Sequence, residues 1–286
     1  MKMAVIGCGL IGGSMALSWK KAGLVDRVIA FGHNPKTLQK ALDKGAADEV
    51  TTSMEEAVKD ADIVVSAVPV EAMESVFTAM APYLKPDVVV TDVGSTRQTV
   101  IAAAQKGLGK MFHRYAPAHP IAGGELPGVD YASADLFTEK AVISTPTEEM
   151  DEDAVRFMEE AWTKVGARVQ KMTPEEHDAI FASVSHLPHV LAYVLVDMIA
   201  KESNAQAKLS MAGAGFRDFT RIASSSPEMW RDICLSNRSA ISEELCRYRA
   251  ALEQMQALID HSDAKGIEQV FDNAMRNRRG LVFPGK

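Results

Sequence analysis

The chain has 286 residues, of which 47% are hydrophobic and 24% charged, and its formal net charge is -7. This length is enough for two domains with cores of their own, and the acidic balance argues against a nucleic-acid-binding surface. Three cysteines leave one over from any disulfide framework, and no apolar run approaches the ~20 residues of a membrane span, so we expect a cytoplasmic protein that binds neither nucleic acid nor membrane.

The N-terminal segment combines an apolar strand, a glycine loop and a helix. The loop reads Gly7-Cys8-Gly9-Leu10-Ile11-Gly12. In this context Gly7 permits a tight turn, Gly9 lets the backbone approach a dinucleotide pyrophosphate, and Gly12 lets the helix pack on the strand. Leu10 and Ile11 begin the helix, whose N-terminus holds the anion. The glycines interrupt the apolar stretch and no cleavage site follows, which argues against a signal peptide.

Strand-like and helix-like segments alternate up to about residue 172, which predicts a Rossmann-type, doubly wound, mostly parallel sheet. We therefore expect a dinucleotide-binding domain over residues 1–172. The expected further strands are 27–31, 63–68 and 88–92, with shorter candidates at 115–118, 141–144 and 167–169, and the expected helices include 35–44 and 151–165.

The residues after the second strand bear on the choice of cofactor. An NAD enzyme usually places Asp or Glu there to bind the ribose 2'-hydroxyl, but this chain has no carboxylate in that segment. Gly32 leaves room for a 2'-phosphate, and His33, Asn34 and Lys36 can donate hydrogen bonds to it. The segment favours NADP over NAD; the alternative is that His33 is an exposed loop residue and both cofactors bind.

Two further cofactor contacts are expected at the end of the third strand, at Val68 and Pro69. Ligands of doubly wound sheets lie at the carboxyl ends of the strands. By the same rule, we expect the reacting groups in two other segments, which contain Ser95 and His119. Both segments follow predicted strands, and glycines beside them let a ligand approach.

After Met172 the pattern becomes almost entirely helical, and we expect a helical domain over residues 173–286. A capping-box sequence at Thr173 to Glu176 predicts the start of a long helix. Pro188 should kink that helix beside Ser185, because it removes an amide donor. His186 and His189 on this helix could be read as metal ligands, but only Asp178 lies nearby at ligand spacing, so we expect no metal.

The last large helix is expected at about 237–261. Its apolar residues alternate spacings of four and three, which is a coiled-coil-like seam: Ile241, Leu245, Tyr248, Leu252, Met255 and Ile259. Packing within one chain would explain this seam as well as a dimer interface does. Because a helical domain with broad apolar faces often completes its core with a second subunit, we favour a homodimer.

Four segments together are far more specific than the glycine loop. They are Asp92-Val93-Gly94-Ser95, His119-Pro120-Ile121-Ala122-Gly123, Ser185-His186-Leu187-Pro188-His189 and Gly215-Phe216-Arg217-Asp218-Phe219-Thr220-Arg221. With them, nearly the whole chain resembles the prephenate and arogenate dehydrogenases of tyrosine biosynthesis. The resemblance implies an oxidative decarboxylation of a cyclohexadienol, with hydride transfer to NAD(P).

The resemblance also implies roles for individual residues. His119 falls on the family's catalytic histidine, which takes the proton from the ring 4-hydroxyl, and Ser95 on its catalytic serine, which bonds that hydroxyl and the imidazole. Arg221 falls on the substrate-binding arginine, whose planar fork suits a carboxylate. Arg217 is interpreted as structural.

Three more residues match positions near the substrate side chain. His189 and Ser185 lie on the kinked helix, and Trp230 matches a residue that can come from the neighbouring subunit. The chain departs from the pattern at Ala214, where relatives often have glycine, and this puts substrate preference in doubt. The sequence leaves open the choice between prephenate and arogenate, as well as feedback by tyrosine.

Two other functions fit the sequence less well. A 3-hydroxyacid dehydrogenase has a similar two-domain architecture, but this chain lacks a lysine followed one turn later by asparagine on the first long helix. A nucleotide-sensing regulator would carry a DNA-reading or effector module, and the acidic charge and the lack of a basic recognition helix argue against it.

Overall fold

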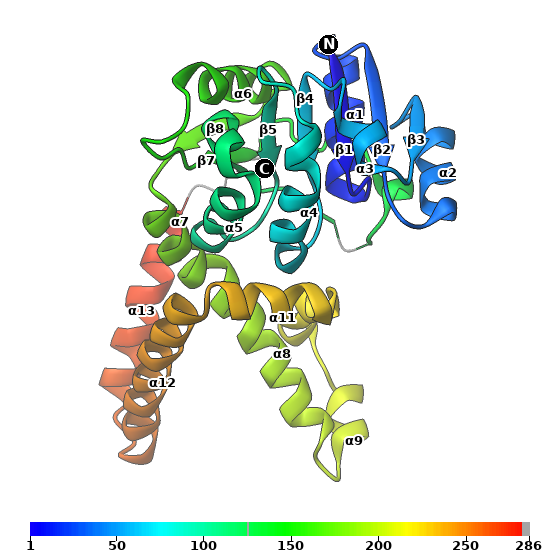
Figure 1. Ribbon diagram of the computed structural model, residues 1–286. Coiled ribbons are helices and arrows are strands. Elements are labelled where there is room, and N and C mark those ends of the chain that lie inside the picture. The colour runs from blue at the N-terminus through cyan, green and yellow to red at the C-terminus, as the bar shows by residue number, and fades with distance from the viewer. Residues whose placement is uncertain (125, 282–286) are drawn as a thin grey trace.

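The computed structural model describes residues 1–124 and 126–281. Figure 1 shows an N-terminal domain of sheets covered by helices and, below it, a C-terminal domain made of helices alone. The strands are β1 Lys2–Ile6, β2 Arg27–Phe31, β3 Glu49–Thr51, β4 Ile63–Ser66, β5 Val89–Asp92, β6 Ala118–Pro120, β7 Ala141–Ser144 and β8 Arg168–Lys171. The helices of the first domain are α1 Leu10–Lys21, α2 Pro35–Asp43, α3 Met54–Val58, α4 Met73–Met80, α5 Gln98–Leu108 and α6 Glu152–Lys164. Those of the second are α7 Pro174–Phe181, α8 Leu187–Ala200, α9 Ala205–Ser210, α10 Ala214–Thr220, α11 Pro227–Ser236, α12 Arg238–Asp260 and α13 Ala264–Gly280.

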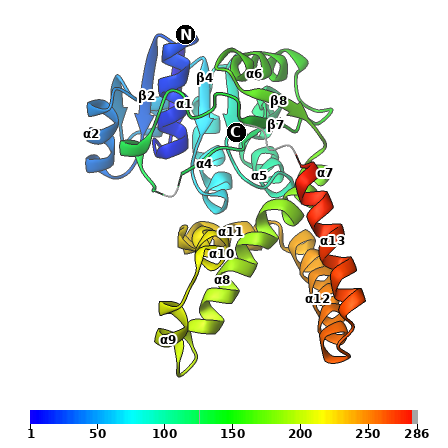
Figure 2. The same cartoon turned by 180° about the vertical axis from the view of Figure 1, so that it is seen from behind.

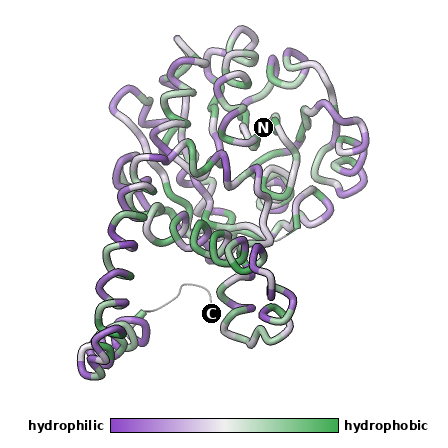
Figure 3. The backbone as a smooth tube through the Cα atoms, turned by 90° about the horizontal axis from the view of Figure 1, so that it is seen from below, coloured by the Kyte–Doolittle hydropathy of each residue, from purple (hydrophilic) through white to green (hydrophobic). Residues whose placement is uncertain are grey.

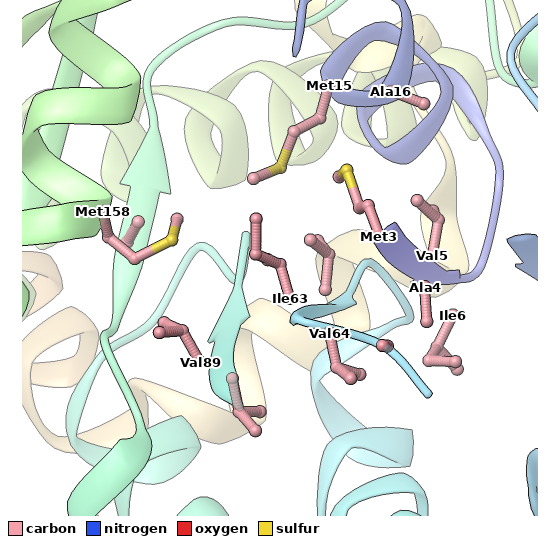
Figure 4. Packing of buried hydrophobic residues seen from close by; sticks show 14 of the residues in the cluster. Met3, Ala4, Val5, Ile6, Met15, Ala16, Ile63, Val64, Val89 and Met158 are labelled. Carbon is pink, nitrogen blue, oxygen red and sulfur yellow. The ribbon is translucent and has the colours of Figure 1, made fainter. Parts of the chain in front are cut away.

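The main sheet is parallel, with the strand order β3-β2-β1-β4-β5, and confirms the predicted doubly wound fold. β1 and β4 are buried over nearly their whole length, as expected of apolar strands covered on both faces. Side chains of β1, β4 and β5 pack with Met15 of α1 and Met158 of α6 (Figure 4). The short strand β3 was not predicted, because its three residues are only partly buried.

The shorter strand candidates do not extend this sheet. They form a second sheet with the order β6-β7-β8, in which β6 and β7 run antiparallel and β7 and β8 parallel. A single bridge from Val90 to Tyr115 connects the first of these stretches to β5. Pro120, which has no amide to donate, is the last residue of β6, and the Ile121 amide after it donates to the Ala141 carbonyl of β7.

The helix after Thr173 begins as predicted. Thr173 and Glu176 form the reciprocal capping box at the start of α7. The expected kink is a π-helical turn, Ala182–His186, which precedes α8. Pro188 cannot donate to the Val184 carbonyl, and a wider turn accommodates the missing bond. The structure thus places irregular backbone next to His186 and His189.

The helical domain leaves much apolar surface exposed. α8 and the pair α12–α13 project away from the N-terminal domain (Figures 1 and 2), and hydrophobic residues recur along them (Figure 3). α12 matches the predicted last large helix, but a further helix, α13, follows it. Exposed apolar side chains on these helices include Val194, Met198, Tyr248, Leu252, Ile259, Val270, Phe271 and Met275.

One helix in the described part of the chain, Pro174–Ala200, is long and apolar enough to cross a membrane by length and composition alone. The expectation that no run approaches this length was therefore wrong as a statement about composition. The length of this apolar helix is not evident from the sequence, because serines, histidines and a proline interrupt its apolar residues. In the structure this helix connects the two domains, and Asp178 near its start binds backbone amides of the N-terminal domain.

Candidate active site

The glycine loop has the geometry of a phosphate cradle. Gly7 has φ +92°, and a Cβ there would lie 2.6 Å from the Ala67 carbonyl oxygen. A Cβ on Gly12 would lie 2.5 Å from the Gly7 oxygen, so neither position admits a side chain. A Cβ on Gly9 meets nothing within 4 Å. Gly9 is also the N-cap of α1, so open space borders the first-turn amides of that helix.

The other predicted cofactor residues border this loop. The Gly7 amide donates to the Phe31 carbonyl, which places the end of β2 and the exposed His33 beside the loop. Asn34 Oδ1 accepts from the Lys36 amide and caps α2, which leaves the Asn34 amide group to donate. Val68 Cγ1 lies 3.1 Å from the position of a Cβ on Gly7, and Pro69 follows directly. The loops after β1, β2 and β4 therefore meet at one edge of the sheet.

His119 lies on β6 and is half-buried. Its Nδ1 is 2.8 Å from Nε2 of His177, and its ring also contacts Phe181. His177 Nδ1 is in turn 2.9 Å from Oδ1 of Asp178. His177 and Asp178 are 0% and 1% exposed. A buried chain of hydrogen bonds thus runs from β6 of the N-terminal domain to α7 of the helical domain.

Asp178 also fixes the start of α5. Its Oδ1 accepts from the Arg97 amide at 2.7 Å, and its Oδ2 accepts from the Gln98 amide at 3.0 Å. Burial by itself would raise the pKa of Asp178, but the hydrogen bonds from His177 and from these two amides lower it overall. Asp178 is therefore a carboxylate that joins the two domains.

Burial and positive charge keep His119 neutral. Burial lowers the pKa of His119 well below 6.5, and His177, Arg97 and His186 lower it further. The fully buried Arg97 side chain is held by Asp92, with its two terminal nitrogens at 2.7 and 2.8 Å from the carboxylate oxygens. A neutral imidazole can accept a proton, so the environment of His119 suits a general base.

A second group of side chains comes from α8, α11 and the turn after α10. His189 stacks on Trp230 with ring centroids 3.7 Å apart, and its Nδ1 is 2.8 Å from the Ser185 carbonyl oxygen. Burial lowers the pKa of His189, and the positive charge of Arg221 lowers it too. Arg221 begins the 3-10 turn after α10 and is exposed. His189, Trp230 and Arg221 therefore share one region.

His186 connects the two groups. It is 1% exposed, and its Nδ1 is 3.2 Å from Nδ2 of Asn237, which also donates to the Asp178 carbonyl. Its ring lies 6.1 Å from that of Trp230, and its charge, when present, lowers the pKa of His119. Burial lowers the pKa of His186 itself to about 4. From His119, contacts lead through His177, Asp178 and Asn237 to His186, and from there through Trp230 to His189. Arg221 is close enough to lower the pKa of His189.

The remaining predicted residues are placed as follows. Ser95 lies in the loop between β5 and α5, and within the described residues its hydroxyl makes no hydrogen bond. His119 Nδ1 contacts His177, so the expected bond from Ser95 to the imidazole would have to use Nε2. Ser185 contributes its carbonyl to His189. Trp230 is buried, and it packs on His189 of its own chain.

Sequence reasoning missed His177 altogether and weighed Asp178 only as a metal ligand. The available signal was a His-Asp pair directly after the capping box, in the first turns of the helix that leaves the last strand. Across residues 1–124 and 126–281, no group of three His, Cys, Asp or Glu side chains is arranged to hold a metal ion.

Comparison with known proteins gives a consistent result. The family model described as the prephenate dehydrogenase nucleotide-binding domain matches residues 15–171, and the one described as the prephenate dehydrogenase dimerization domain matches residues 173–273. The chain is 36% identical to a cyclohexadienyl dehydrogenase of Zymomonas mobilis over 281 residues, which cover 98% of this chain and 95% of the relative. It is 34% identical to a prephenate dehydrogenase of Bacillus subtilis, covering 98% and 76%.

Solved structures agree with these relatives. The structure of prephenate dehydrogenase from Aquifex aeolicus in complex with hydroxyphenyl propionate and NAD+ superposes with a TM-score of 0.92 at 33% identity, covering 98% of this chain and 97% of that one. An arogenate dehydrogenase of Synechocystis superposes with a TM-score of 0.83 at 26% identity, covering 99% and 100%.

Proposed function

Because this chain belongs to the prephenate dehydrogenase family, we propose that it oxidatively decarboxylates prephenate, arogenate or both, with hydride transfer to a nicotinamide cofactor. The observation that carries the proposal is the position of the neutral His119, 2.8 Å from His177 of the helical domain, which also carries the stacked pair His189–Trp230 and the cation Arg221. The 3-hydroxyacid dehydrogenase alternative has no better support. We assign residues 1–172 to dinucleotide binding and 173–286 to substrate binding and dimerisation.

The residues around the glycine loop fit a dinucleotide. Open space at Gly9, beside the first-turn amides of Leu10 and Ile11, admits the pyrophosphate, and Val68 and Pro69 border the same loop. When bound, the nicotinamide accepts the hydride from the ring carbon that bears the 4-hydroxyl. The protein has to hold the substrate at that position and remove the hydroxyl proton.

In the proposed reaction His119 Nε2 takes the proton of the 4-hydroxyl as the hydride leaves the same carbon. The C4–O bond becomes a carbonyl, which draws electrons from the ring. The bond from the ring to its carboxylate then breaks and carbon dioxide departs. Its electron pair enters the ring and moves the carbonyl π electrons onto the oxygen, so the ring becomes aromatic. The oxygen takes back the proton that His119 holds, which gives the phenol and restores the neutral imidazole. Aromatisation makes the reaction irreversible. Ser95 would donate to the substrate oxygen, a role that its free hydroxyl leaves open.

The carboxylates of the substrate need cationic and polar partners. Arg221 offers a planar, permanently charged donor set for one of them. His189, Ser185 and Trp230 would contact the side chain, which carries a keto group in prephenate and an ammonium in arogenate. Ala214 is at the start of α10, the helix that leads to Arg221, and could tune this choice.

The decisive experiment follows formation of the reduced cofactor at its absorbance band, with prephenate and arogenate assayed in parallel. We expect turnover with at least one substrate, and an aromatic product that appears together with carbon dioxide. Turnover of small 3-hydroxy acids, and none of either cyclohexadienol, would contradict the proposal.

We further propose that NADP is preferred over NAD. The support is the lack of a carboxylate after β2 and the three donors there, namely His33, the amide of Asn34 and Lys36. Comparison of kcat/KM for the two cofactors tests this directly. Lys36→Ala should reduce the ratio in favour of NADP, whereas an equal or higher efficiency with NAD in the parent enzyme would reject the preference.

We propose a cytoplasmic homodimer that associates through the helical domain. The exposed apolar side chains of α8, α12 and α13 supply the surface for a second copy. All three cysteines, which lie in the described part of the chain, are free thiols, as a reducing compartment requires.

A further inference from the structure

We propose that His177 and Asp178 are positioning residues that fix the tautomer of His119, so that its Nε2 presents a lone pair to the substrate hydroxyl. This inference rests on the proposed function, because it concerns the base of that reaction. Within the described residues, neither side chain hydrogen-bonds to the glycine loop, and both act through the His119 ring.

Asp178, at the end of the chain His119–His177–Asp178, sets the direction of both hydrogen bonds in it. Asp178 is ionised, so its Oδ1 can only accept and His177 Nδ1 must donate to it. Burial lowers the pKa of His177, which is therefore a neutral imidazole with a single N–H. Its Nε2 must accept, and the atom 2.8 Å away that donates to it is Nδ1 of His119. A neutral His119 then carries its proton on Nδ1, and Nε2 is free to act as a base.

The Asp178 carboxylate is held in one orientation by four hydrogen bonds, and a rotation would break them. Oδ1 receives the Arg97 amide together with His177, and Oδ2 receives both the backbone amide and the side-chain amide of Gln98. An asparagine at this position would direct its NH2 group at one of these donors. If that group faced His177, the ring of His177 would exchange its donor and acceptor nitrogens, and His119 would follow.

The wrong tautomer of His119 would point an N–H at the substrate hydroxyl and could not remove its proton. In the Ser-His-Asp triad of proteases, replacing the orienting Asp by Asn lowers kcat about 10⁴-fold for this reason. A positioned base contributes typically ~10²- to 10⁴-fold, which sets the range expected for Asp178→Asn. KM should change much less, because Arg221 and its neighbours are left in place.

The variants form a matched set. His177→Phe keeps an aromatic ring against Phe181, which His177 stacks on at 4.4 Å, but cannot accept from His119. His177→Gln restores an acceptor oxygen, so we expect it to recover part of the kcat that His177→Phe loses. Thr99→Val is the control, because it removes an interdomain hydrogen bond to the Ser236 carbonyl without touching the histidines. Thermal unfolding of each variant shows whether it is folded.

A second measurement needs no substrate. Nitrogen NMR of the full-length protein with 15N-labelled histidine rings reports which ring nitrogen carries the proton, and the His119→Asn spectrum identifies the signals of His119. We expect His119 to be protonated on Nδ1 in the parent protein, and this preference to be lost in His177→Phe.

Two results would overturn the inference: a His119 proton on Nε2 in the parent spectrum, or a kcat for His177→Phe no lower than that of Thr99→Val. If Asp178→Asn fails to fold, the pair of His177 variants and the parent spectrum still decide. A parent enzyme that turns over neither cyclohexadienol would contradict the proposed function, while the spectrum would still report the tautomer.

Discussion

At the scale of single residues, the proposed base and the proposed anion-binding cation, His119 and Arg221, stand on different elements, β6 and the turn after α10. Burial lowers the pKa of His119, and Arg97, a permanent cation, lowers it further. Arg221 stays exposed on the turn after α10. In the proposed mechanism, proton removal and anion binding belong to different residues, so separate variants can test them.

His119→Asn should lower kcat by ~10²- to 10⁴-fold with little change in KM, since it removes the base and leaves the anion site intact. In the parent enzyme, activity should fall as acid protonates His119. Because its pKa lies well below 6.5, the acidic limb of the kcat/KM profile should also lie below pH 6.5. A fully active, pH-independent His119→Asn enzyme would remove His119 from the mechanism.

Arg221→Ala should raise KM with a smaller effect on kcat. A charge-assisted hydrogen bond contributes about 1.5–3 kcal/mol, which corresponds to a roughly 10- to 100-fold change in KM. Arg217→Ala is the matched control, because Arg217 is an equally exposed arginine one turn earlier, on α10. Steady-state kinetics on both variants make the comparison, and equal KM values would reject the assignment of Arg221.

At the scale of elements, sequence patterns predicted what depends on local signals. The parallel strands, the capping box at Thr173 and the irregular backbone near Pro188 all follow from periodicity, caps and proline chemistry. The separate sheet β6-β7-β8 was not predicted, because strand pairing depends on contacts across the chain. His177 escaped notice for the same reason: its partner His119 is 58 positions away. The resemblance to a family supplied the candidate residues, but not the bonds between them.

The buried histidine of the π-helical turn should make stability depend on pH. The pKa of His186 is lowered from 6.5 to about 4 in the folded protein. Between these two pH values, His186 is protonated in the unfolded chain but stays neutral in the folded protein. The contribution of His186 to the free energy of unfolding is therefore fully present above pH 6.5. It declines by about 3 kcal/mol as the pH falls toward 4.

Urea unfolding at a series of pH values measures this effect. His186→Gln should flatten the decline between pH 6.5 and 4, because glutamine does not titrate. His261→Gln, at the exposed end of α12, is the control and should leave the slope unchanged. A His186→Gln slope identical to that of the parent would refute the link.

At the scale of the whole molecule, the helical domain is incompletely covered. Leu252 and Ile259 of α12 are 52% and 58% exposed, although both belong to the predicted apolar seam. We expect the double change of Leu252 and Ile259 to glutamate to shift the protein from dimer to monomer in sedimentation velocity. Arg249→Glu alters an exposed charge on the same helix and should leave the dimer intact. A parent protein that sediments as a monomer would count against the interface.

The contacts of Asp178 have a consequence for how this architecture can be recombined. The Asp178 carboxylate on α7 accepts from the amides at the start of α5, and Thr99 of α5 donates to the Ser236 carbonyl of α11. Each of these hydrogen bonds has one partner in each domain. A chimera that joins the sheets of one relative to the helices of another has to transfer these partners together. Crossover points should therefore lie outside the segments 92–99 and 177–189. Both segments should come from the same relative, so that their hydrogen bonds are kept.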